Sequence, residues 1–310
     1  MALVVFLGAA RVAAHDYWMT PDPRASPPGP VTVHLWVGEN LEPEEERPFA
    51  ADRTVSFVHI TKKEAARALD PVDGVPLWRG ALAAGGHLFA LHRNIAYVEL
   101  EAKRFEGYLR HKGLTSIIEE RAARGESDAP GTERYQRYLK LWFAVGEAPD
   151  DVYGRVVGHE LELLLLDRPK AGAPIRIRTL FRGQPLPGFS MTAQREGGEP
   201  QRLQTDAQGE LTLPALEAGM WLARGVHMLR VDGDKRADWE SFWAAFTFTV
   251  AEPTSAPTMP TPLPPSKGCG GCHIERDRSS DGEWVRLALL GLLGAARRRF
   301  GRRASSLRTA

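Results

Sequence analysis

The chain has 310 residues, which is enough for two domains that each bury a core of their own. Its 40 Lys and Arg residues nearly balance 39 Asp and Glu residues, and runs of basic residues occur only in the last segment, which argues against a nucleic-acid-binding protein. Both cysteines, Cys269 and Cys272, also lie in the last segment, so disulfides play no part in the stability of residues 15–250.

Residues 1–14 are predicted to be a signal peptide. An apolar run at 2–10 precedes Ala13 and Ala14, small residues of the kind found at a signal peptidase site. If cleavage follows Ala14, the mature chain begins with His15, whose α-amine and imidazole together can chelate copper, nickel or cobalt. Two plainer interpretations stay open: the apolar run is a buried first strand, or His15 merely follows the cleavage site.

Residues 15–150 are predicted to form a first β-sandwich. A Pro-rich extended start leads into segments whose side chains alternate between apolar and polar, which is the pattern of half-buried strands. These strands are expected at residues 31–37, 55–60, 88–91 and 95–100.

A helical insertion is expected within this first sandwich. Apolar residues recur at helical spacing over residues 101–124, and Gly113 divides the segment into two short helices. Residues 133–143 are predicted to form a further helix, or a helix that runs into a strand. Their aromatic side chains are expected to pack in a core rather than to contact a ligand.

Residues 151–250 are predicted to form a second sandwich, because short strands alternate with Gly- and Pro-containing turns. Residues 175–181 alternate most clearly, which places Ile175, Ile177 and Thr179 on one face. The predicted fold class is therefore mainly β, with two β-sandwich (immunoglobulin-like) domains, a helical insertion, a Pro-rich linker and a C-terminal anchor segment.

The chain ends in a linker and a three-part tail. The Pro-rich linker, residues 251–268, favours semi-rigid polyproline II. The tail, residues 269–303, holds a Gly-Cys motif, then a hydrophobic run, then an arginine cluster made by Arg297, Arg298 and Arg299. It resembles the MYXO-CTERM type of sorting signal, which implies processing near Cys269 and Cys272 and anchoring on the outer surface. Two departures are a long charged spacer and Arg286, which interrupts a run shorter than the ~20 residues that span a bilayer.

The cysteine motif has two other interpretations. Cys269-Gly-Gly-Cys-His273 also fits the pattern of covalent haem c attachment, but no methionine follows it as a second axial ligand. Haem c is therefore not the preferred prediction. A zinc site made by the paired thiols and His273 is the remaining alternative.

Residues 15–250 resemble the NikM-like family of periplasmic proteins, which is also catalogued as a conserved domain of unknown function. The resemblance rests on the order of several short motifs: HDYW at 15–18, FEGYL at 105–109 with GL at 113–114, ERYQRYLK at 133–140, GHELE at 158–162 with DRP at 167–169, FRGQP at 181–185, TDAQG at 205–209, HM at 227–228 and WESFW at 239–243. It implies an accessory or substrate-binding role in nickel or cobalt uptake, with membrane components of a transport system as partners.

Metal ligands, if present, must come from distant parts of the chain. His15 is the first candidate and His227 the second, because His227 lies in a predicted strand that matches the resemblance. His34 and His159 come third. Each of His227, His34 and His159 is by itself more often a structural histidine, so the set predicts a metal site only if folding brings its members together.

The sequence predicts a non-catalytic protein, because no nucleophile elbow and no Gly-rich phosphate loop is present. We expect an exported, envelope-anchored metal-binding protein for nickel or cobalt, with copper as a third option. Its expected partners are a metal ion, a transport system and, through the tail, a membrane, with no nucleic acid. Two alternatives stay open: a cell-surface interaction module without metal, and a copper-dependent redox protein with an amino-terminal histidine brace at His15.

Overall fold

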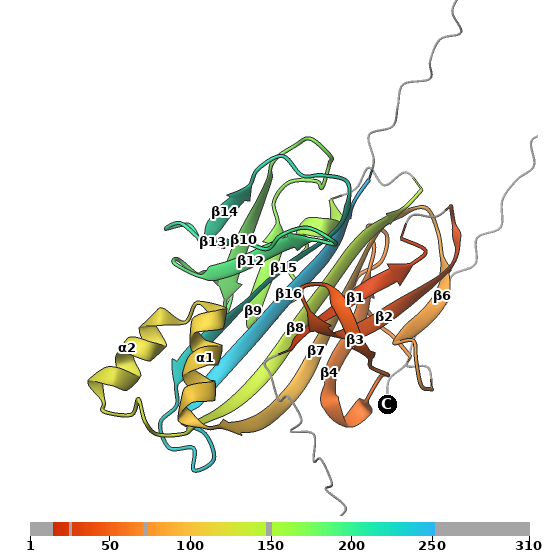
Figure 1. Cartoon of the computed structure of the whole chain (residues 1–310). Coiled ribbons are helices and arrows are strands. Elements are labelled where there is room, and N and C mark those ends of the chain that lie inside the picture. The colour runs from red at the N-terminus through yellow and green to blue at the C-terminus, as the bar shows by residue number, and fades with distance from the viewer. Residues whose placement is uncertain (1–14, 25–26, 71–72, 147–150, 252–310) are drawn as a thin grey trace, which may run out of the picture. The chain divides into compact units, whose positions relative to one another are not determined.

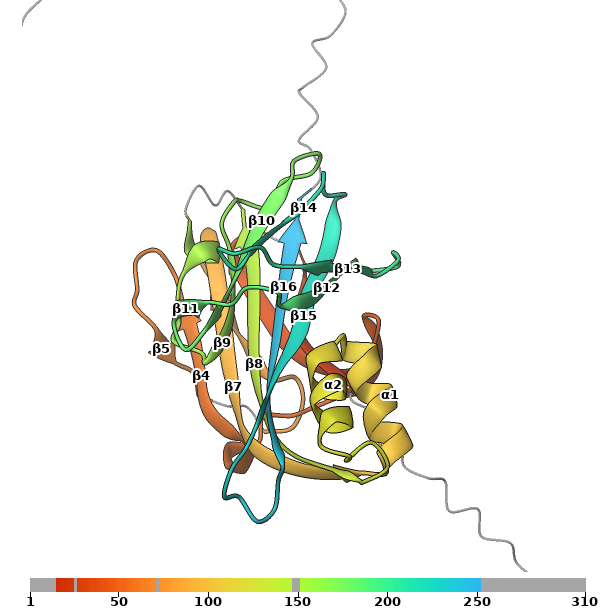
Figure 2. The same cartoon turned by 90° about the vertical axis from the view of Figure 1, so that its left-hand side faces the viewer.

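The computed structural model describes residues 15–24, 27–70, 73–146 and 151–251, and β-strands dominate this part of the chain. The described strands form one eight-stranded sheet and two four-stranded sheets, accompanied by two short helices (Figures 1 and 2). The predicted mainly β class is therefore confirmed. No helix within these described ranges is long and apolar enough to cross a membrane.

Several predictions fall outside the described residues. They concern the signal peptide, the linker beyond residue 251 and the sorting tail with Cys269, Cys272, Arg297, Arg298 and Arg299.

The eight-stranded sheet, called the central sheet, has the order β13-β12-β15-β16-β8-β7-β4-β5. Neighbouring strands are antiparallel except β16 and β8, which are parallel. The long strands β7, β8 and β16 run side by side through the middle of the described fold (Figure 1). The strand bounds are β4 (Thr54–Ile60), β5 (Arg67–Ala68), β7 (Gly85–Leu100), β8 (Gly131–Val145), β12 (Ser190–Arg195), β13 (Gln201–Gln204), β15 (Gly219–Arg230) and β16 (Trp239–Val250).

The helix predicted over residues 133–143 is wrong, because this segment is part of β8. Leu139 and Leu141 pack in a core on one face of the central sheet, whereas Tyr138 and Trp142 pack in a second core on the other face. A strand buried on both faces lacks the apolar–polar alternation that identifies a half-buried strand. Its apolar run therefore could not be distinguished from a buried helix by period alone.

The N-terminal sheet, made of β1, β2, β3 and β6, covers one face of the central sheet. β2 is its middle strand and pairs antiparallel with the other three. Trp18, Met19 and Leu35 are fully buried against Phe89 and Leu141 of the central sheet. The strand bounds are β1 (Asp16–Asp22), β2 (Gly29–Glu39), β3 (Glu42–Glu46) and β6 (Trp78–Leu82), and a 3-10 turn, η1 (Ala51–Arg53), precedes β4.

The β10 sheet, made of β9, β10, β11 and β14, covers the opposite face. Ile175, Ile177 and Thr179 of β10 are at most 1% exposed, which confirms the face predicted from their alternation. Ile175 and Ile177 contribute to a core shared with Phe242 and Phe246 of β16. The bounds are β9 (Leu161–Leu165), β10 (Ile175–Phe181), β11 (Gln184–Pro185) and β14 (Glu210–Leu213), and a 3-10 turn, η2 (Val152–Gly154), precedes β9.

The two predicted short helices are confirmed as α1 (Ala102–Lys112) and α2 (Thr115–Ala123). Gly113 ends α1 in the left-handed conformation, with φ of 74°, which a glycine adopts without steric cost. Phe105 and Leu109 of α1 pack against Trp239 of β16, on the same face of the central sheet as the N-terminal sheet. The helices therefore lie beside β1, and α1 comes close to the start of the described chain.

The expected domain boundary at residue 150 does not separate two sheets. β4, β5, β7 and β8 precede it and β12, β13, β15 and β16 follow it, yet all eight strands form the central sheet. The described residues also fall within one unit of contacts, Met1–Ala256. The parallel pairing of β16 with β8 joins the two halves, and this long-range pairing leaves no local signal in the sequence.

Candidate functional site

Two of the four candidate histidines lie on the N-terminal sheet. The imidazole Nε2 of His15, just before β1, is 3.7 Å from Glu44 Oε2 on β3. The Nδ1 of His34, on β2, is 2.7 Å from Glu46 Oε1, and its ring stacks on Trp36. Each histidine thus has a carboxylate partner of its own.

The other two candidates lie on the opposite side of the central sheet. His227 makes an edge contact with Phe181 of the β10 sheet, at 4.5 Å between ring centroids. Burial, followed by the charge of Arg182, lowers the pKa of His227 to about 4. His159 is buried beside Tyr138, and burial lowers its pKa to about 3.

The predicted metal set therefore does not converge. His15 and His34 belong to the layer on one face of the central sheet, whereas His227 and His159 belong to the other. In the described ranges, no group of three or more His, Cys, Asp or Glu side chains is arranged to hold a metal ion. The four histidines do not fit a shared metal centre, since the central sheet separates the two pairs.

The stretch 15–18 nevertheless has a central structural position. Asp16 is 6% exposed, and its carboxylate lies 2.6 Å from Arg224 Nε and 2.8 Å from Lys112 Nζ. These contacts connect β1 to β15 and to α1. Burial lowers the pKa of Lys112, and Asp16 counteracts that effect. The carboxylate therefore compensates two cations inside the protein.

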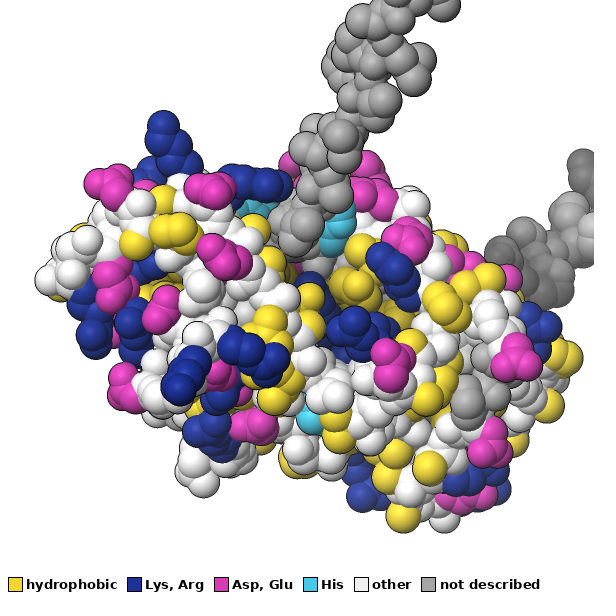
Figure 3. Space-filling view, turned by 90° about the horizontal axis from the view of Figure 1, so that it is seen from below, with side chains coloured by type: hydrophobic (Ala, Val, Ile, Leu, Met, Phe, Trp, Pro, Cys, Tyr) yellow, Lys and Arg dark blue, Asp and Glu magenta, His cyan; other side chains and the backbone are white. Residues whose placement is uncertain are grey.

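A cavity of about 430 Å³ lies next to this stretch, and we call it the arginine pocket. Its lining comes from four segments: β1, the chain around η1, the β7 bulge and β8. The side chains that line it are Tyr17, Arg47, Pro48, Ala50, Asp52, Arg53, Arg93, Asn94, Ala96, Tyr135 and Arg137. Seen from below, the molecule shows Lys and Arg side chains gathered beside a hollow near the centre of that face (Figure 3).

Arg93 and Arg137 are the inner cations of this pocket. They are direct register partners on β7 and β8, so two positive side chains stand opposite each other across the ladder. Like charges in this position destabilise a sheet. A bulge in β7 between Arg93 and Ala96 shifts the register beside them and pairs Ala96 with Tyr135.

Aromatic rings hold the Arg137 guanidinium in place. Its central carbon lies 4.3 Å from the ring centre of Tyr17, 4.5 Å from Trp243 and 5.2 Å from Tyr135. Arg93 lies 5.4 Å from the same Tyr17 ring. Stacking satisfies the faces of a guanidinium but leaves its N–H donors for other partners.

Among the described residues, the outer arginines of the pocket have carboxylate partners and the inner ones do not. Arg47 pairs with Glu45 at 2.8 Å and Arg53 with Asp52 at 3.5 Å. In the part of the chain that the structure describes, neither Arg93 nor Arg137 forms an ion pair. Burial lowers the pKa of Arg93, and the charges of Arg137, Arg47 and Arg53 add to that effect. The pocket thus concentrates uncompensated positive charge.

A buried acid lies behind the pocket wall. Glu133 of β8 is 2% exposed and accepts hydrogen bonds from Ser241 and from Tyr108, the latter at 3.3 Å. The Ser241 hydroxyl in turn accepts one from Trp243 Nε1 at 2.9 Å. Burial raises the pKa of Glu133 to about 7. Glu133 therefore gains or loses its proton near neutral pH. It lies close to Trp243, the ring of which also stacks on Arg137.

The arginine pocket is not among the sites predicted from the sequence. A charged residue within a strand that is buried on both faces is unusual, and Arg137 in β8 is such a residue. This signal depended on identifying β8 as a strand, whereas a helix was predicted there. Arg47, Arg53 and Arg93 carry no comparable signal, since their segments are far apart in the sequence.

Comparisons with known proteins identify a family, and the description of that family names no activity. No curated protein matches the chain. Among solved structures, a two fibronectin type-III domain segment from chicken tenascin is similar at 13% identity, covering 74% of this chain and 96% of that one, with a TM-score of 0.19. A family model described as a domain of unknown function, DUF4198, matches residues 12–228. This match covers more than half of the sequence, and the chain therefore belongs to the DUF4198 family.

Proposed function

We propose that this protein is a non-catalytic binding protein whose arginine pocket takes a small anionic ligand. The observation that carries the proposal is the opposed pair of Arg93 and Arg137, which lack carboxylate partners among the described residues. Two facing cations cost stability in the free protein, and a bound anion would offset that cost. A functional site is the usual place for such a local conflict.

The ligand chemistry follows from the lining. Guanidinium groups donate paired hydrogen bonds to carboxylates and phosphates, and rigid stacking of Arg137 fixes its plane before the ligand arrives. The rings of Tyr17 and Tyr135 add an apolar wall. A volume of about 430 Å³ lies within the range of small-molecule sites, roughly 300–1,000 Å³. Small polycarboxylates and phosphates are therefore the favoured class.

Calorimetric titration with citrate, inorganic phosphate and sulfate tests this proposal. Arg93→Gln and Arg137→Gln should each lower the affinity for the best of these anions at least tenfold. Arg176→Gln is the matched control, because Arg176 is an exposed cation that pairs with Asp167 on the far side of the central sheet. Saturable binding that all three variants retain equally, or no anion binding by the wild type, would refute the proposal.

A second proposal keeps the metal expectation in a narrower form. If the mature chain begins at His15, its amine and Nδ1 can chelate nickel, cobalt or copper. The supporting observation is Glu44, whose Oε2 lies 3.7 Å from Nε2, at ion-pair rather than hydrogen-bond distance, and which leaves Nδ1 for the chelate. His227 cannot be the third ligand, since it contacts the β10 sheet.

Two proteins test the chelate: one that begins at His15 and one with a single Gly before His15. The added residue moves the amine out of chelating reach and leaves the imidazole unchanged. We expect nickel affinity to fall at least tenfold in the extended protein. We also expect affinity in the shorter protein to weaken from about pH 8 to 6, as the amine and the imidazole become protonated. Equal affinities with equal pH dependence would contradict the chelate.

The remaining expectations from the sequence are also proposed for this protein. They are the immunoglobulin-like form of the β-sandwich domains, membership of the NikM-like group, export, and anchoring at the cell envelope through the tail. Intact mass and N-terminal sequencing of the protein from its own envelope would test both ends of the chain. A mature chain that keeps residues 1–14 and the whole tail would contradict export and sorting.

A further inference from the structure

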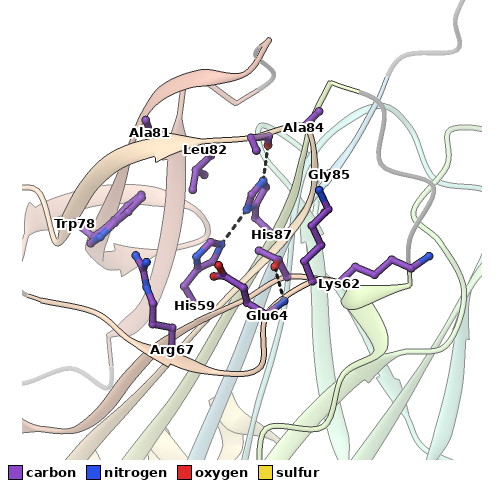
Figure 4. A pocket seen from close by; sticks show the side chains of 14 residues that line it. His59, Lys62, Glu64, Arg67, Trp78, Ala81, Leu82, Ala84, Gly85 and His87 are labelled. Carbon is purple, nitrogen blue, oxygen red and sulfur yellow. Dashed lines mark hydrogen bonds between the residues drawn. The ribbon is translucent and has the colours of Figure 1, made fainter. Parts of the chain in front are cut away.

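A second cavity, which we call the histidine pocket, shares no lining residue with the arginine pocket. It has a volume of about 370 Å³ and lies where β4, β6 and the start of β7 meet. His59 of β4 and His87 of β7 form its inner wall, and they are 6% and 4% exposed (Figure 4). Two buried imidazoles in a cavity without an assigned ligand need an explanation.

The hydrogen bonds around these imidazoles determine which nitrogens carry protons. His87 Nε2 lies 2.9 Å from the backbone oxygen of Ala83, and a carbonyl only accepts, so Nε2 donates. With the proton on Nε2, the neutral tautomer of His87 has a lone pair on Nδ1. His59 Nε2 lies 2.9 Å from that Nδ1 and, beside this tautomer, is the donor. The second nitrogen of His59, Nδ1, is consequently left as an acceptor.

His59 keeps this form at neutral pH. Burial, followed by the proximity of His87 and Arg67, lowers its pKa to about 4. Within the described residues, no donor to His59 Nδ1 is found. Nδ1 is also not among the fully buried side-chain atoms without a partner, and His59 lines the cavity. The inner wall therefore presents one neutral, oriented hydrogen-bond acceptor.

The rest of the cavity is divided into an apolar wall and a charged rim. Trp78, Leu82 and the alanines at 81, 83 and 84 form the wall. The rim carries Lys62, Lys63 and Arg67 against one carboxylate, Glu64, so it is cationic on balance (Figure 4). A cation at His59 would meet this positive rim, which disfavours a metal ion.

We propose that the histidine pocket binds a small hydroxylated carboxylic acid with an apolar body. The hydroxyl donates to His59 Nδ1, the apolar body lies against Trp78 and Leu82, and the carboxylate meets Lys62 and Arg67 at the rim. A site that is built to hydrogen-bond a ligand hydroxyl rejects the analogue that lacks it, because the buried acceptor is then left without a partner.

Three related probes test this on the intact protein: 4-hydroxybenzoate, benzoate and phenol. Benzoate lacks the donor and phenol lacks the carboxylate. We expect saturable binding of 4-hydroxybenzoate in calorimetry and at least tenfold weaker binding of both others. Equal binding of 4-hydroxybenzoate and benzoate, or no binding of any probe, would overturn the proposal.

Two variants assign the effect to the pocket. His59→Phe keeps a ring but removes the acceptor, and should abolish the preference for 4-hydroxybenzoate over benzoate. Arg67→Gln, at an exposed position where folding is not at risk, should weaken both acids and leave phenol unchanged. Unchanged binding in Arg67→Gln overturns the proposal even if His59→Phe does not fold. Nickel or copper binding that depends on His59 and excludes 4-hydroxybenzoate would instead identify a metal site.

Discussion

Asp16→Asn is the most informative single change outside the pockets, since it removes charge and almost no volume. The wild-type carboxylate lies 2.6 Å from Arg224 and 2.8 Å from Lys112, and all three side chains are at most 10% exposed. The amide leaves two buried cations without a counterion. Breaking a buried ion pair in this way costs about 3–5 kcal/mol. At about 2–4 °C per kcal/mol for a unit of this size, the melting temperature should fall by roughly 6–20 °C.

Urea and thermal unfolding, followed by near-UV circular dichroism, measure this change. Asp167→Asn is the matched control, because Asp167 pairs with Arg176 at 2.9 Å on the surface, where solvent screens the pair and it contributes little to stability. Adding Lys112→Met to Asp16→Asn should recover part of the loss by removing one unpaired cation. Equal small losses for Asp16→Asn and Asp167→Asn would refute the view that Asp16 joins β1, β15 and α1.

Three further predictions concern the layers around the central sheet. Ile177→Asp should destabilise the protein by several kcal/mol, because Ile177 is fully buried in the β10 sheet, and an unchanged melting temperature would contradict that burial. Burial raises the pKa of Glu133 from 4.5 to about 7, so the folded state binds a proton that the unfolded state has lost, and the free energy of unfolding should fall by about 3 kcal/mol from pH 4.5 to 7. Urea titrations at both pH values should show that Glu133→Gln removes this fall. The same fall in the wild type and in Glu133→Gln would argue against it. Gly113→Ala should lower the free energy of unfolding, measured by chemical denaturation, by more than about 1 kcal/mol, because φ of residue 113 is 74° and the new Cβ would lie 2.5 Å from Ser190 Oγ. An unchanged free energy of unfolding would show that the end of α1 relaxes to accommodate the Cβ.

Much of the secondary structure followed from local patterns. β10 alternates because only one of its faces is buried in a core, and the prediction of strand and face was correct. The helices were predicted at the right place because Gly113 interrupts an amphipathic segment, and the structure ends α1 there. β7 was predicted as two strands, since the bulge between Arg93 and Ala96 interrupts its alternation.

The candidate metal site could not be predicted from single histidines, because their residue type does not say which of them lie close together. The four histidines are predicted as ligands from their residue type, and in the structure each lies beside a different partner: Glu44, Glu46, Phe181 or Tyr138. Which side of a sheet a residue faces depends on strand register, and a shift of one residue reverses it. No local sequence pattern predicts whether the histidines of two distant strands lie on the same face of a sheet.

The sequence by itself determined the strand-rich class, the two short helices and the inward face of β10, because these depend on neighbours within a few residues. Only the tertiary structure decided that β16 pairs in parallel with β8, which joins both halves of the chain in one sheet. The β7–β8 register brings Arg93 and Arg137 face to face, next to Tyr17 from β1, and the β16–β8 pairing adds Trp243 beside Arg137. The arginine pocket is made by segments that are far apart in the sequence, so its charge becomes visible only after long-range pairing has placed them together.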